Sequence, residues 1–357
     1  MSFWKPGPGT RVALVLSGGI GLGAYQAGVY EALHEREDLS LDWLAASSIG
    51  AVSAALIAGT PREQRVAALR AFWMNPPFGS AVFPGVEIGG PWRHAQNWIS
   101  VLQARLFGAR GHFHPRLASP SSEGFTSIYD LGPMRRRIEK LVDFERLNNG
   151  NIRLCVATTD IETGDPVVFD TGNAMRVGID HLQASCGFLP EFPPVEIDNR
   201  LLGDGGLSTN APFEPVVEEQ DDRERITFVV DLYARDGGRP TGLESALARK
   251  NDLLFGNQTY LRLEAWQRER QLREEVARLR DRGTARKGRR KNRVFYLSYR
   301  APPEEAGPEK AFDLSRSTIE TRWRAGRLDM QEALNRIDSD AAADDSRPLV
   351  VIRRQPE

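Results

Sequence analysis

Cysteine is scarce in this chain, since its 357 residues include only Cys155 and Cys186. Two cysteines cannot build the disulfide framework of a small secreted protein and fit a reducing compartment, although one bridge between them is compatible with the sequence. The sequence holds neither a CxxC pair nor an HExxH motif. A structural zinc or zincin site therefore has no support, and we expect no metal and no cofactor.

The chain also lacks an excess of one charge and a long apolar segment. Its 47 Lys and Arg against 48 Asp and Glu give a formal net charge of −1, which argues against nucleic acid as a partner. The apolar run at 12–16 is too short for the core of a signal peptide. The longest charge-free apolar stretch, 43–59, barely reaches the length of a membrane helix and contains three serines. We therefore expect a cytoplasmic protein without a transmembrane segment.

The pattern of elements predicts an α/β fold. Hydrophobic residues make up 41% and charged residues 27% of the chain, as in ordinary globular proteins. Short apolar runs typical of strands alternate with helical patterns, which favours an α/β/α layered fold with a mainly parallel central sheet. The expected strands are 11–16, 43–46, 152–158, 166–170 and 226–232, and the expected helices begin near 24, 51, 62 and 133.

Composition divides the chain into a main domain at 8–235, a helical C-terminal extension at 236–340 and a frayed tail at 341–357. The extension is expected to be mixed, with helices over 260–282 and from a capping box at Ser317 and Glu320, and a strand at 294–299. Within the main domain, residues 75–126 are rich in Pro and Gly and read as an insertion, a type of segment that is more often functional than idle.

The insertion contains an apolar helix candidate at 92–107. Trp92, Trp98 and Phe107, with Phe113 beyond them, could contact a substrate or form a lid. The alternative is a local hydrophobic cluster that packs the insertion down. Both interpretations fit the sequence.

Residues 46–50, Ala46-Ser47-Ser48-Ile49-Gly50, lie between a predicted strand and a predicted helix. This is the context of a nucleophile elbow, G-x-S-x-G, with Ala46 in the first glycine position. Such a turn strains the backbone of Ser48 and exposes its hydroxyl, and the following helix N-terminus favours negative charge beside it. The alternative is a turn of small residues without catalysis.

A glycine-rich segment at 17–23 follows the first predicted strand, and three interpretations compete for it. Gly19, Gly21 and Ala24 match the dinucleotide fingerprint G-x-G-x-x-A, with Asp38 and Asp42 about twenty residues later. The segment could instead be an oxyanion hole, in which backbone N–H groups stabilise charge on a carbonyl oxygen, or a tight structural turn. The oxyanion donors would come from Gly18, Gly19, Ile20 and Gly21.

A third motif places Asp204 between Gly203 and the pair Gly205 and Gly206. A carboxylate held on a glycine turn suits a general base, whereas an ordinary β-turn is the plain alternative. None of the five histidines, which are His34, His94, His112, His114 and His181, follows Asp204. A triad in the order Ser, acid, His would need His181 with Asp160 or Asp170, so the pattern favours a Ser48–Asp204 dyad.

These motifs, in this order, resemble the patatin-like phospholipase family of serine hydrolases. In that family a glycine loop, a G-x-S-x-G serine and an Asp-Gly-Gly/Ala motif form a Ser–Asp dyad without histidine. The resemblance covers about 10–235 and implies a patatin-like fold with Ser48 as nucleophile, Asp204 as base and the oxyanion hole at 18–21. The matching stretches are 14–19, 23–29, 48–51, 184–185, 192–194 and 204–206. Residues 260–270 and 312–327 resemble a bacterial subgroup, some members of which are assigned as intracellular polyhydroxyalkanoate depolymerases.

Two positions depart from the family pattern. Ile20 stands where the family usually has a third glycine, and Leu22 stands where a basic residue is usual. A β-branched residue resists a positive φ angle. If position 20 needs a left-handed backbone, Ile20 is expected to distort the oxyanion hole.

The resemblance implies a lipid acyl hydrolase that acts on hydrophobic esters such as phospholipids and contacts a membrane or storage granule peripherally. An intracellular polyhydroxybutyrate depolymerase is the first alternative, and an inactive patatin-like scaffold or a dinucleotide-binding module is the second. Residues 261–293 hold 13 basic and 5 acidic groups. The basic run at 286–293 could contact acidic headgroups or nucleic acid, but the pattern favours a solvated loop.

Overall fold

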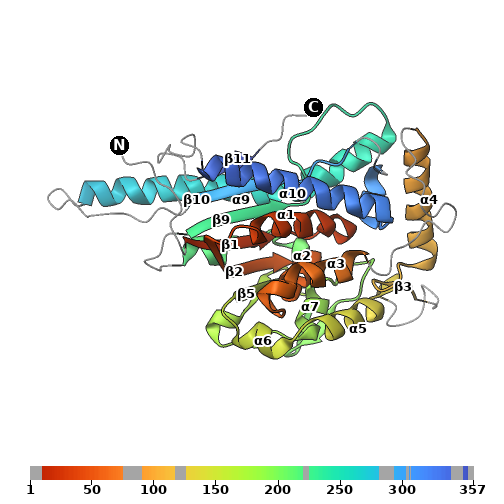
Figure 1. The fold of residues 1–357 in the computed structure, drawn as a ribbon, viewed down its shortest axis with the longest axis horizontal. Helices are drawn as coiled ribbons and strands as arrows, with labels where there is room; N and C mark the ends of the chain where they lie inside the picture. The colour runs from red at the N-terminus through yellow and green to blue at the C-terminus, as the bar shows by residue number, and fades with distance from the viewer. Residues whose placement is uncertain are drawn as a thin grey trace.

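The computed structural model describes residues 10–74, 91–116, 126–219, 225–280, 293–302, 305, 307–338 and 349–352. Within these residues, nine strands form one sheet in the order β11-β10-β9-β1-β2-β5-β8-β7, with β6 paired to β5. Helices cover both faces of this sheet (Figure 1). The α/β fold with a mainly parallel sheet is therefore confirmed.

The parallel part of the sheet runs from β11 to β5, and the antiparallel part lies at the β5 end. A small separate pair joins β3 (His114–Pro115) to β4 (Tyr129–Asp130). The parallel strands are β1 (Thr10–Leu16), β2 (Leu39–Ser47), β5 (Arg153–Asp160), β9 (Arg225–Asp231), β10 (Arg293–Ser298) and β11 (Leu349–Ile352); the antiparallel ones are β6 (Pro166–Asp170), β7 (Val195–Ile197) and β8 (Arg200–Asp204).

The layers follow from the alternation of side chains along the central strands. Val12, Leu14 and Leu16 face the layer that contains α1, α2 and α10, whereas Ala13 and Val15 face α8 and α9. The helices are α1 (Ala24–His34), α2 (Ile49–Ala58), α3 (Arg65–Met74), α4 (Pro91–Phe107), α5 (Gly132–Leu141), α6 (Phe144–Asn149), α7 (Ile179–Ser185), α8 (Glu214–Glu218), α9 (Leu243–Arg280) and α10 (Arg316–Asp338). The 3₁₀ turns are η1 (Ile20–Gly23), η2 (Arg62–Gln64), η3 (Thr171–Asn173), η4 (Gly205–Leu207) and η5 (Gly307–Phe312).

Helices α1 and α10 touch backbone to backbone. A Cβ atom on Gly28 would lie 1.8 Å from the carbonyl oxygen of Trp323, and one on Gly326 would lie 1.9 Å from that of Tyr25. Only glycine permits this approach. Because α10 packs on α1 and β10 pairs with β9, the C-terminal elements share one layered body with the N-terminal ones. The division at residue 235 stays a prediction.

Two sequence expectations are corrected by the fold. Helix α9 begins at Leu243 and not near 260. The tail is not frayed throughout, because Leu349–Ile352 forms β11 beside β10. The capped helix expected from Ser317 is α10, which begins at Arg316. Residues 286–292 of the basic run lie outside the described residues, and Arg293 begins β10.

In the part of the chain that the structure describes, no helix combines the length and the apolar character needed to cross a membrane.

Candidate active site

Ser48 occupies a sharp turn between the end of β2 and the start of α2. Its φ and ψ angles are 55° and −131°, a conformation that a residue other than glycine adopts only when its surroundings enforce it. The Ser48 N–H donates a 2.8 Å hydrogen bond to Ser185 Oγ. A Cβ atom on Gly50 would lie 2.4 Å from the carbonyl oxygen of Leu16, so glycine there lets α2 approach β1. The strained elbow that the sequence predicted is present.

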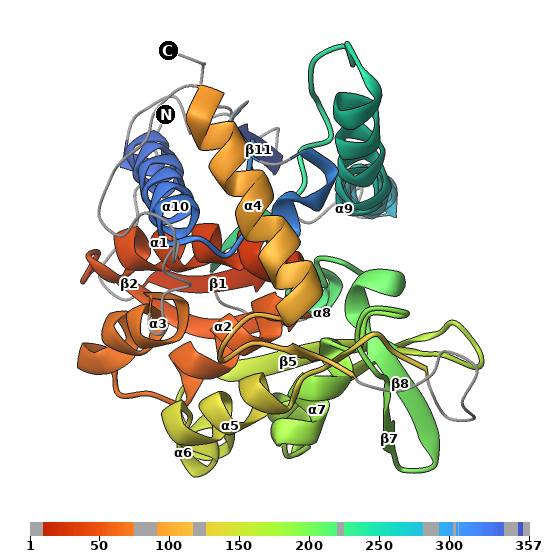
Figure 2. The ribbon, with the colours of Figure 1, turned by 90° about the vertical axis from the view of Figure 1, so that its right-hand side faces the viewer.

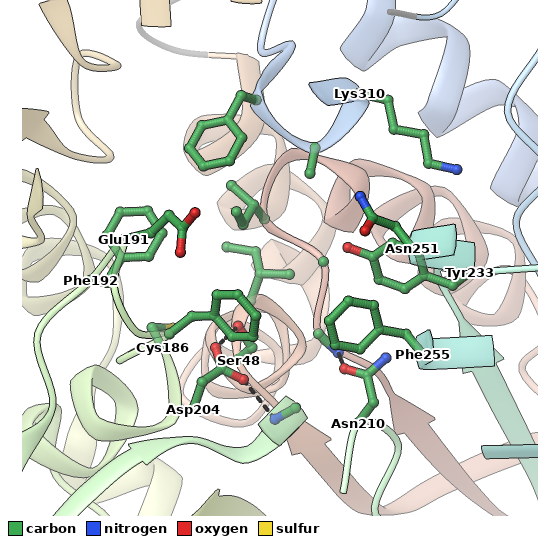
Figure 3. Close-up of a pocket in the computed structure, with 18 of the residues that line it drawn as sticks. Ser48, Cys186, Glu191, Phe192, Asp204, Asn210, Tyr233, Asn251, Phe255 and Lys310 are labelled. Carbon is green, nitrogen blue, oxygen red and sulfur yellow. Dashed lines mark hydrogen bonds between the residues drawn. The ribbon is translucent and has the colours of Figure 1, made fainter. Parts of the chain in front are cut away.

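Asp204 lies at the end of β8 and faces Ser48 (Figure 3). The Ser48 hydroxyl donates a 2.5 Å hydrogen bond to Asp204 Oδ2. The other carboxylate oxygen, Oδ1, accepts a 2.7 Å bond from the N–H of Gly206. A Cβ atom on Gly205 would lie 2.5 Å from the carbonyl oxygen of Ala157, so this glycine lets the turn rest against β5. The structure thus brings together the two residues that the sequence singled out.

Burial raises the pKa of the Asp204 carboxyl to about 7, and the hydrogen bonds from Ser48 and Gly206 only partly offset this effect. A general base works best when its pKa lies near the working pH, because it is then largely deprotonated and still basic enough to accept a proton. The environment of Asp204 therefore suits a carboxylate that takes a proton from the Ser48 hydroxyl near neutral pH.

The glycine-rich segment at 17–23, called the glycine turn below, lies directly beside Ser48. A Cβ atom on Gly18 would lie 2.8 Å from Ser48 Cβ, and the Gly18 N–H already donates to Asn210. The N–H groups of Gly19 and Ile20 have no protein acceptor within the described residues, and both residues line the cavity at Ser48. Gly21 instead lies against the carbonyl oxygen of Ala311. Of the four expected oxyanion donors, Gly19 and Ile20 are thus the two that line the cavity and keep an N–H without an acceptor among the described residues; their role stays a prediction.

Ile20 itself has a φ angle of 49°. Position 20 therefore does take the left-handed backbone that the sequence analysis identified as unfavourable for isoleucine. The side chain is partly buried against the hydrophobic core, and this packing offsets part of the strain.

Ser48 and Asp204 lie in a cavity of about 330 Å³. Apolar side chains make up much of its wall, and polar or charged groups lie among them. Tyr233, Asn251 and Lys310 gather on one side of Ser48, and Glu191 and Phe192 lie on the other (Figure 3). We call Asn210, Tyr233, Lys250, Asn251 and Lys310 the polar wall; Arg105, His112 and Glu191 also line the cavity, and the apolar lining includes Ile20, Ile49, Phe113, Leu131, Met134, Phe188, Phe192, Leu254, Phe255 and Phe312.

Sequence reasoning missed the polar wall, because no motif marks its residues. Asn210 is the clearest case. Its Oδ1 atom accepts the Gly18 N–H at 3.1 Å, and its Nδ2 atom is buried without a partner among the described residues. Lys310 comes from η5 and Lys250 from α9, which places the C-terminal part of the chain in the site.

The three aromatic residues expected to contact substrate do not line the cavity. Trp92 and Phe107 are exposed on α4, and Trp98 donates from Nε1 to His94. The insertion does reach the cavity, but through Arg105, His112 and Phe113. A substrate contact by Trp92, Trp98 or Phe107 stays a prediction and would occur outside the cavity. Residues 75–90 and 117–125 of the lid candidate lie outside the described residues.

The geometry gives the triad alternative no support. His181 Nδ1 accepts from the N–H of Gly178, and His181 does not line the cavity. Asp160 pairs with Arg200, and Asp170 pairs with Arg153. His112 is the one cavity-lining histidine of the described residues. Burial lowers its pKa to about 4, and no described hydrogen bond joins it to Ser48 or Asp204.

The dinucleotide alternative is also weakened. Asp42, one of the two acids that would bind a ribose, pairs with Arg11 at 2.8 Å and with Arg225 at 3.3 Å. Asp38 pairs with Arg36 at 2.7 Å.

The thiols of Cys155 and Cys186 are both free and buried, and Cys186 lines the cavity. Among the described residues, no cluster of three or more His, Cys, Asp or Glu side chains could hold a metal ion.

Comparison with known proteins gives one family match. A family model described as "Patatin-like phospholipase" matches residues 14–217. The "Patatin-like phospholipase domain-containing protein ZK370.4" of Caenorhabditis elegans is 27% identical over 208 residues, which is 58% of this chain and 12% of that protein. The chain therefore spans a small part of the length of this curated relative.

Two solved structures are similar to the chain at low sequence identity. VipD from Legionella pneumophila is 14% identical, with 92% of this chain and 67% of that chain covered and a TM-score of 0.41. The ExoU–SpcU complex of Pseudomonas aeruginosa is 14% identical, with coverage of 94% and 52% and a TM-score of 0.37.

Proposed function

Because the chain belongs to the patatin-like phospholipase family, we propose that it hydrolyses lipid acyl esters, with Ser48 as the nucleophile and Asp204 as the general base. The observation that carries the proposal is the 2.5 Å hydrogen bond from Ser48 Oγ to Asp204 Oδ2 in the cavity. This contact supplies a nucleophile and its base in one geometry, without a histidine.

The reaction would proceed through an acyl-enzyme. Asp204 accepts the proton of the Ser48 hydroxyl as Oγ attacks the ester carbonyl carbon. The N–H groups of Gly19 and Ile20 donate to the carbonyl oxygen as it gains negative charge. The protonated Asp204 then gives its proton to the departing alcohol. A water molecule, deprotonated by Asp204, attacks the acyl carbon. Asp204 then returns this proton to Ser48 Oγ as the bond between Oγ and the acyl group breaks and the fatty acid leaves.

The mixed lining of the cavity supports an ester that has an apolar part and a polar part. An acyl chain would gain from burial against side chains such as Phe192, Met134 and Phe312, at up to ~0.8 kcal/mol per methylene group. Lys250 and Asn251 would face the polar part, and a lysine ammonium group suits a phosphate, whereas the ammonium group of Lys310 already pairs with Asp252 at 2.7 Å. The ammonium group of Lys250 therefore favours a phospholipid over a uniform polyester of hydroxy acids.

A direct comparison of substrates tests the proposal. The purified chain is offered vesicles of anionic phospholipid and amorphous granules of hydroxybutyrate polymer side by side, with the Ser48→Ala variant as a control. We expect fatty acid release by the wild type and none by the variant. Release of hydroxy acid without fatty acid would establish the depolymerase alternative. Release of neither would favour the inactive scaffold.

A further inference from the structure

One side of α4 is apolar and uncovered. Four of its large apolar residues, Trp92, Ile99, Leu102 and Leu106, recur at intervals of seven, three and four and so form a stripe along the helix. Together with Phe107 at its end, these side chains are between 50% and 75% exposed. The opposite side of the helix, with Val101 and Ala104, is buried. No described residue covers the stripe.

This stripe lies on the face where the cavity is found. Arg105 of α4 lines the cavity, and so does Leu254 of α9, which is 58% exposed. Leu243 and Leu247 lie on the same side of α9 as Leu254, since the three follow each other at intervals of four and seven, and both are exposed. Figure 2 shows α4 crossing this face, with the start of α9 beside it. Two exposed apolar helix faces therefore flank the cavity.

The segment that contains α4 has an excess of positive charge. Residues 91–116 contain four arginines, at positions 93, 105, 110 and 116, and no Asp or Glu. The acidic side chains that reach this segment from other elements include Glu191 at Arg105, Glu244 at His94 and Asp130 at His114. Basic residues within reach of a bilayer surface gain about 1 kcal/mol each from anionic headgroups. The exposed apolar side chains of the stripe could contact either a protein partner or a lipid surface. The positive charge of the segment favours an anionic lipid surface. Contiguous apolar patches of this kind on an exposed face usually mark an interaction site.

We propose that α4 and the first turns of α9 form the surface by which this protein docks on an anionic lipid layer. The apolar side chains of both helices would lie at the boundary between headgroups and acyl chains, as in interfacial amphipathic helices, with the arginines at the headgroups. The cavity would then face the lipids, and an ester could reach Ser48 without crossing water. The inference rests on the proposed function only in taking the docked lipid as a source of substrate.

The far end of α9 supplies a matched control. Leu272, Val276 and Leu279 are exposed to a similar degree, and Leu279 lies roughly 38 Å along the helix from Leu254 at ~1.5 Å per residue. In Figure 1 this end of α9 projects away from the side of the molecule that carries α4. Lipid docking on the α4 face should not use it.

The experiment measures vesicle binding without turnover. In a Ser48→Ala background, the triple variant Ile99→Gln, Leu102→Gln, Leu106→Gln is compared with Leu272→Gln, Val276→Gln, Leu279→Gln by cosedimentation with equimolar phosphatidylcholine and phosphatidylglycerol vesicles. We expect the α4 variant to bind at least ~10-fold more weakly than its parent and the α9 variant to bind within ~2-fold of it. Vesicles of phosphatidylcholine alone should bind the parent more weakly than the mixed vesicles.

A second measurement separates docking from catalysis. With Ser48 intact, both triple variants should hydrolyse a short water-soluble ester at the wild-type rate, which also shows that they fold. Equal vesicle binding by the two variants would overturn the docking proposal and leave the proposed function standing. A wild type that sediments as a dimer without lipid, and an α4 variant that sediments as a monomer, would assign the face to a second copy instead. Normal binding without turnover of any ester would overturn the proposed function alone.

Discussion

The backbone N–H of Ser48 donates to the hydroxyl of Ser185, which in turn donates a 2.7 Å hydrogen bond to the carbonyl oxygen of Ala157 in β5. A side chain at the end of α7 therefore connects the elbow to the sheet. Because a positive φ angle at a serine persists only when its surroundings enforce it, this link helps to hold Ser48 in place.

Ser185→Ala should destabilise the protein by ~1–3 kcal/mol, because it leaves the buried N–H of Ser48 without an acceptor. Urea unfolding measures the difference. The control is Ser53→Ala in α2, since Ser53 is equally buried and its hydroxyl has no partner among the described residues. Its unfolding free energy should change by less than ~0.5 kcal/mol. Equal losses in the two variants would show that the Ser185 link does not hold the elbow.

The nucleophile can be identified by labelling. A fluorophosphonate probe should modify Ser48, and Ser48→Ala should abolish both labelling and esterase activity. Ser47→Ala should retain both, because Ser47 is fully buried and does not line the cavity. Peptide mapping by mass spectrometry locates the label. Labelling that persists in Ser48→Ala would exclude the assignment.

Asp204→Asn should lower kcat by at least ~10², as expected for a lost general base, and should stabilise the fold at pH 8. Burial raises the pKa of Asp204 from 3.8 to about 7. Between these values the folded protein holds a proton that the unfolded chain releases, so stability falls as the pH rises. About three pKa units correspond to roughly 4 kcal/mol, an upper bound on the gain.

Thermal unfolding at pH 4 and pH 8 checks the second part of this prediction. The variant should be more stable than the wild type at pH 8, and the difference should fade toward pH 4, where the folded carboxyl is protonated and the unfolded one, with a pKa of 3.8, is close to half protonated. In the variant, the amide oxygen can accept from Gly206 and the amide nitrogen can donate to Ser48. A loss of stability at pH 8 would contradict the raised pKa.

The pH dependence of kcat/KM on a short neutral ester should follow the ionisation of Asp204. The rate should rise about tenfold per pH unit below ~7 and level off above it, because only the carboxylate accepts the Ser48 proton. His112→Asn should leave the midpoint unchanged, since the pKa of His112 is about 4. A midpoint that moves in His112→Asn would point to histidine as the titrating base.

Ile20→Gly tests whether strain in the glycine turn limits catalysis. Glycine adopts the 49° φ angle of this position freely. The substitution therefore removes backbone strain of ~1–2 kcal/mol, which roughly offsets the packing lost with a partly buried side chain. We expect an unfolding free energy within ~1 kcal/mol of the wild type and an esterase rate at or above it. An inactive wild type together with an active Ile20→Gly variant would show that this isoleucine disables the native site.

The sequence predicted the geometry around Ser48 and Asp204 well, because each motif carries its own backbone requirement. Small residues around Ser48 permit the elbow, and Gly205 permits the close approach to β5. The parallel strands β1, β2, β5, β9 and β10 were equally clear, since residues of a parallel sheet are buried on both faces and read as continuous apolar runs. The short strands β7, β8 and β11 were not expected.

The sequence was less informative where packing decides the structure. The helix expected from about 260 begins at Leu243, and it contains Gly256, where a Cβ atom would lie 2.7 Å from the carbonyl oxygen of Tyr233. The polar wall of the cavity is another case. Lys310 and Lys250 reach it from elements far apart in the chain, and only the tertiary fold determines that they meet.

The contact between α1 and α10 has a consequence for biosynthesis. The hydroxyl of Tyr25 donates a 2.7 Å hydrogen bond to Asp329, 304 positions later. At ~5–20 residues per second, the ribosome needs roughly 15–60 s to supply the second helix after the first. Nearly all of α1 is buried in the finished fold, so its apolar side waits that long without its partner. The side of α1 that faces α10 therefore stays uncovered until α10 emerges, and exposed apolar surface of this kind makes nascent chains prone to aggregate.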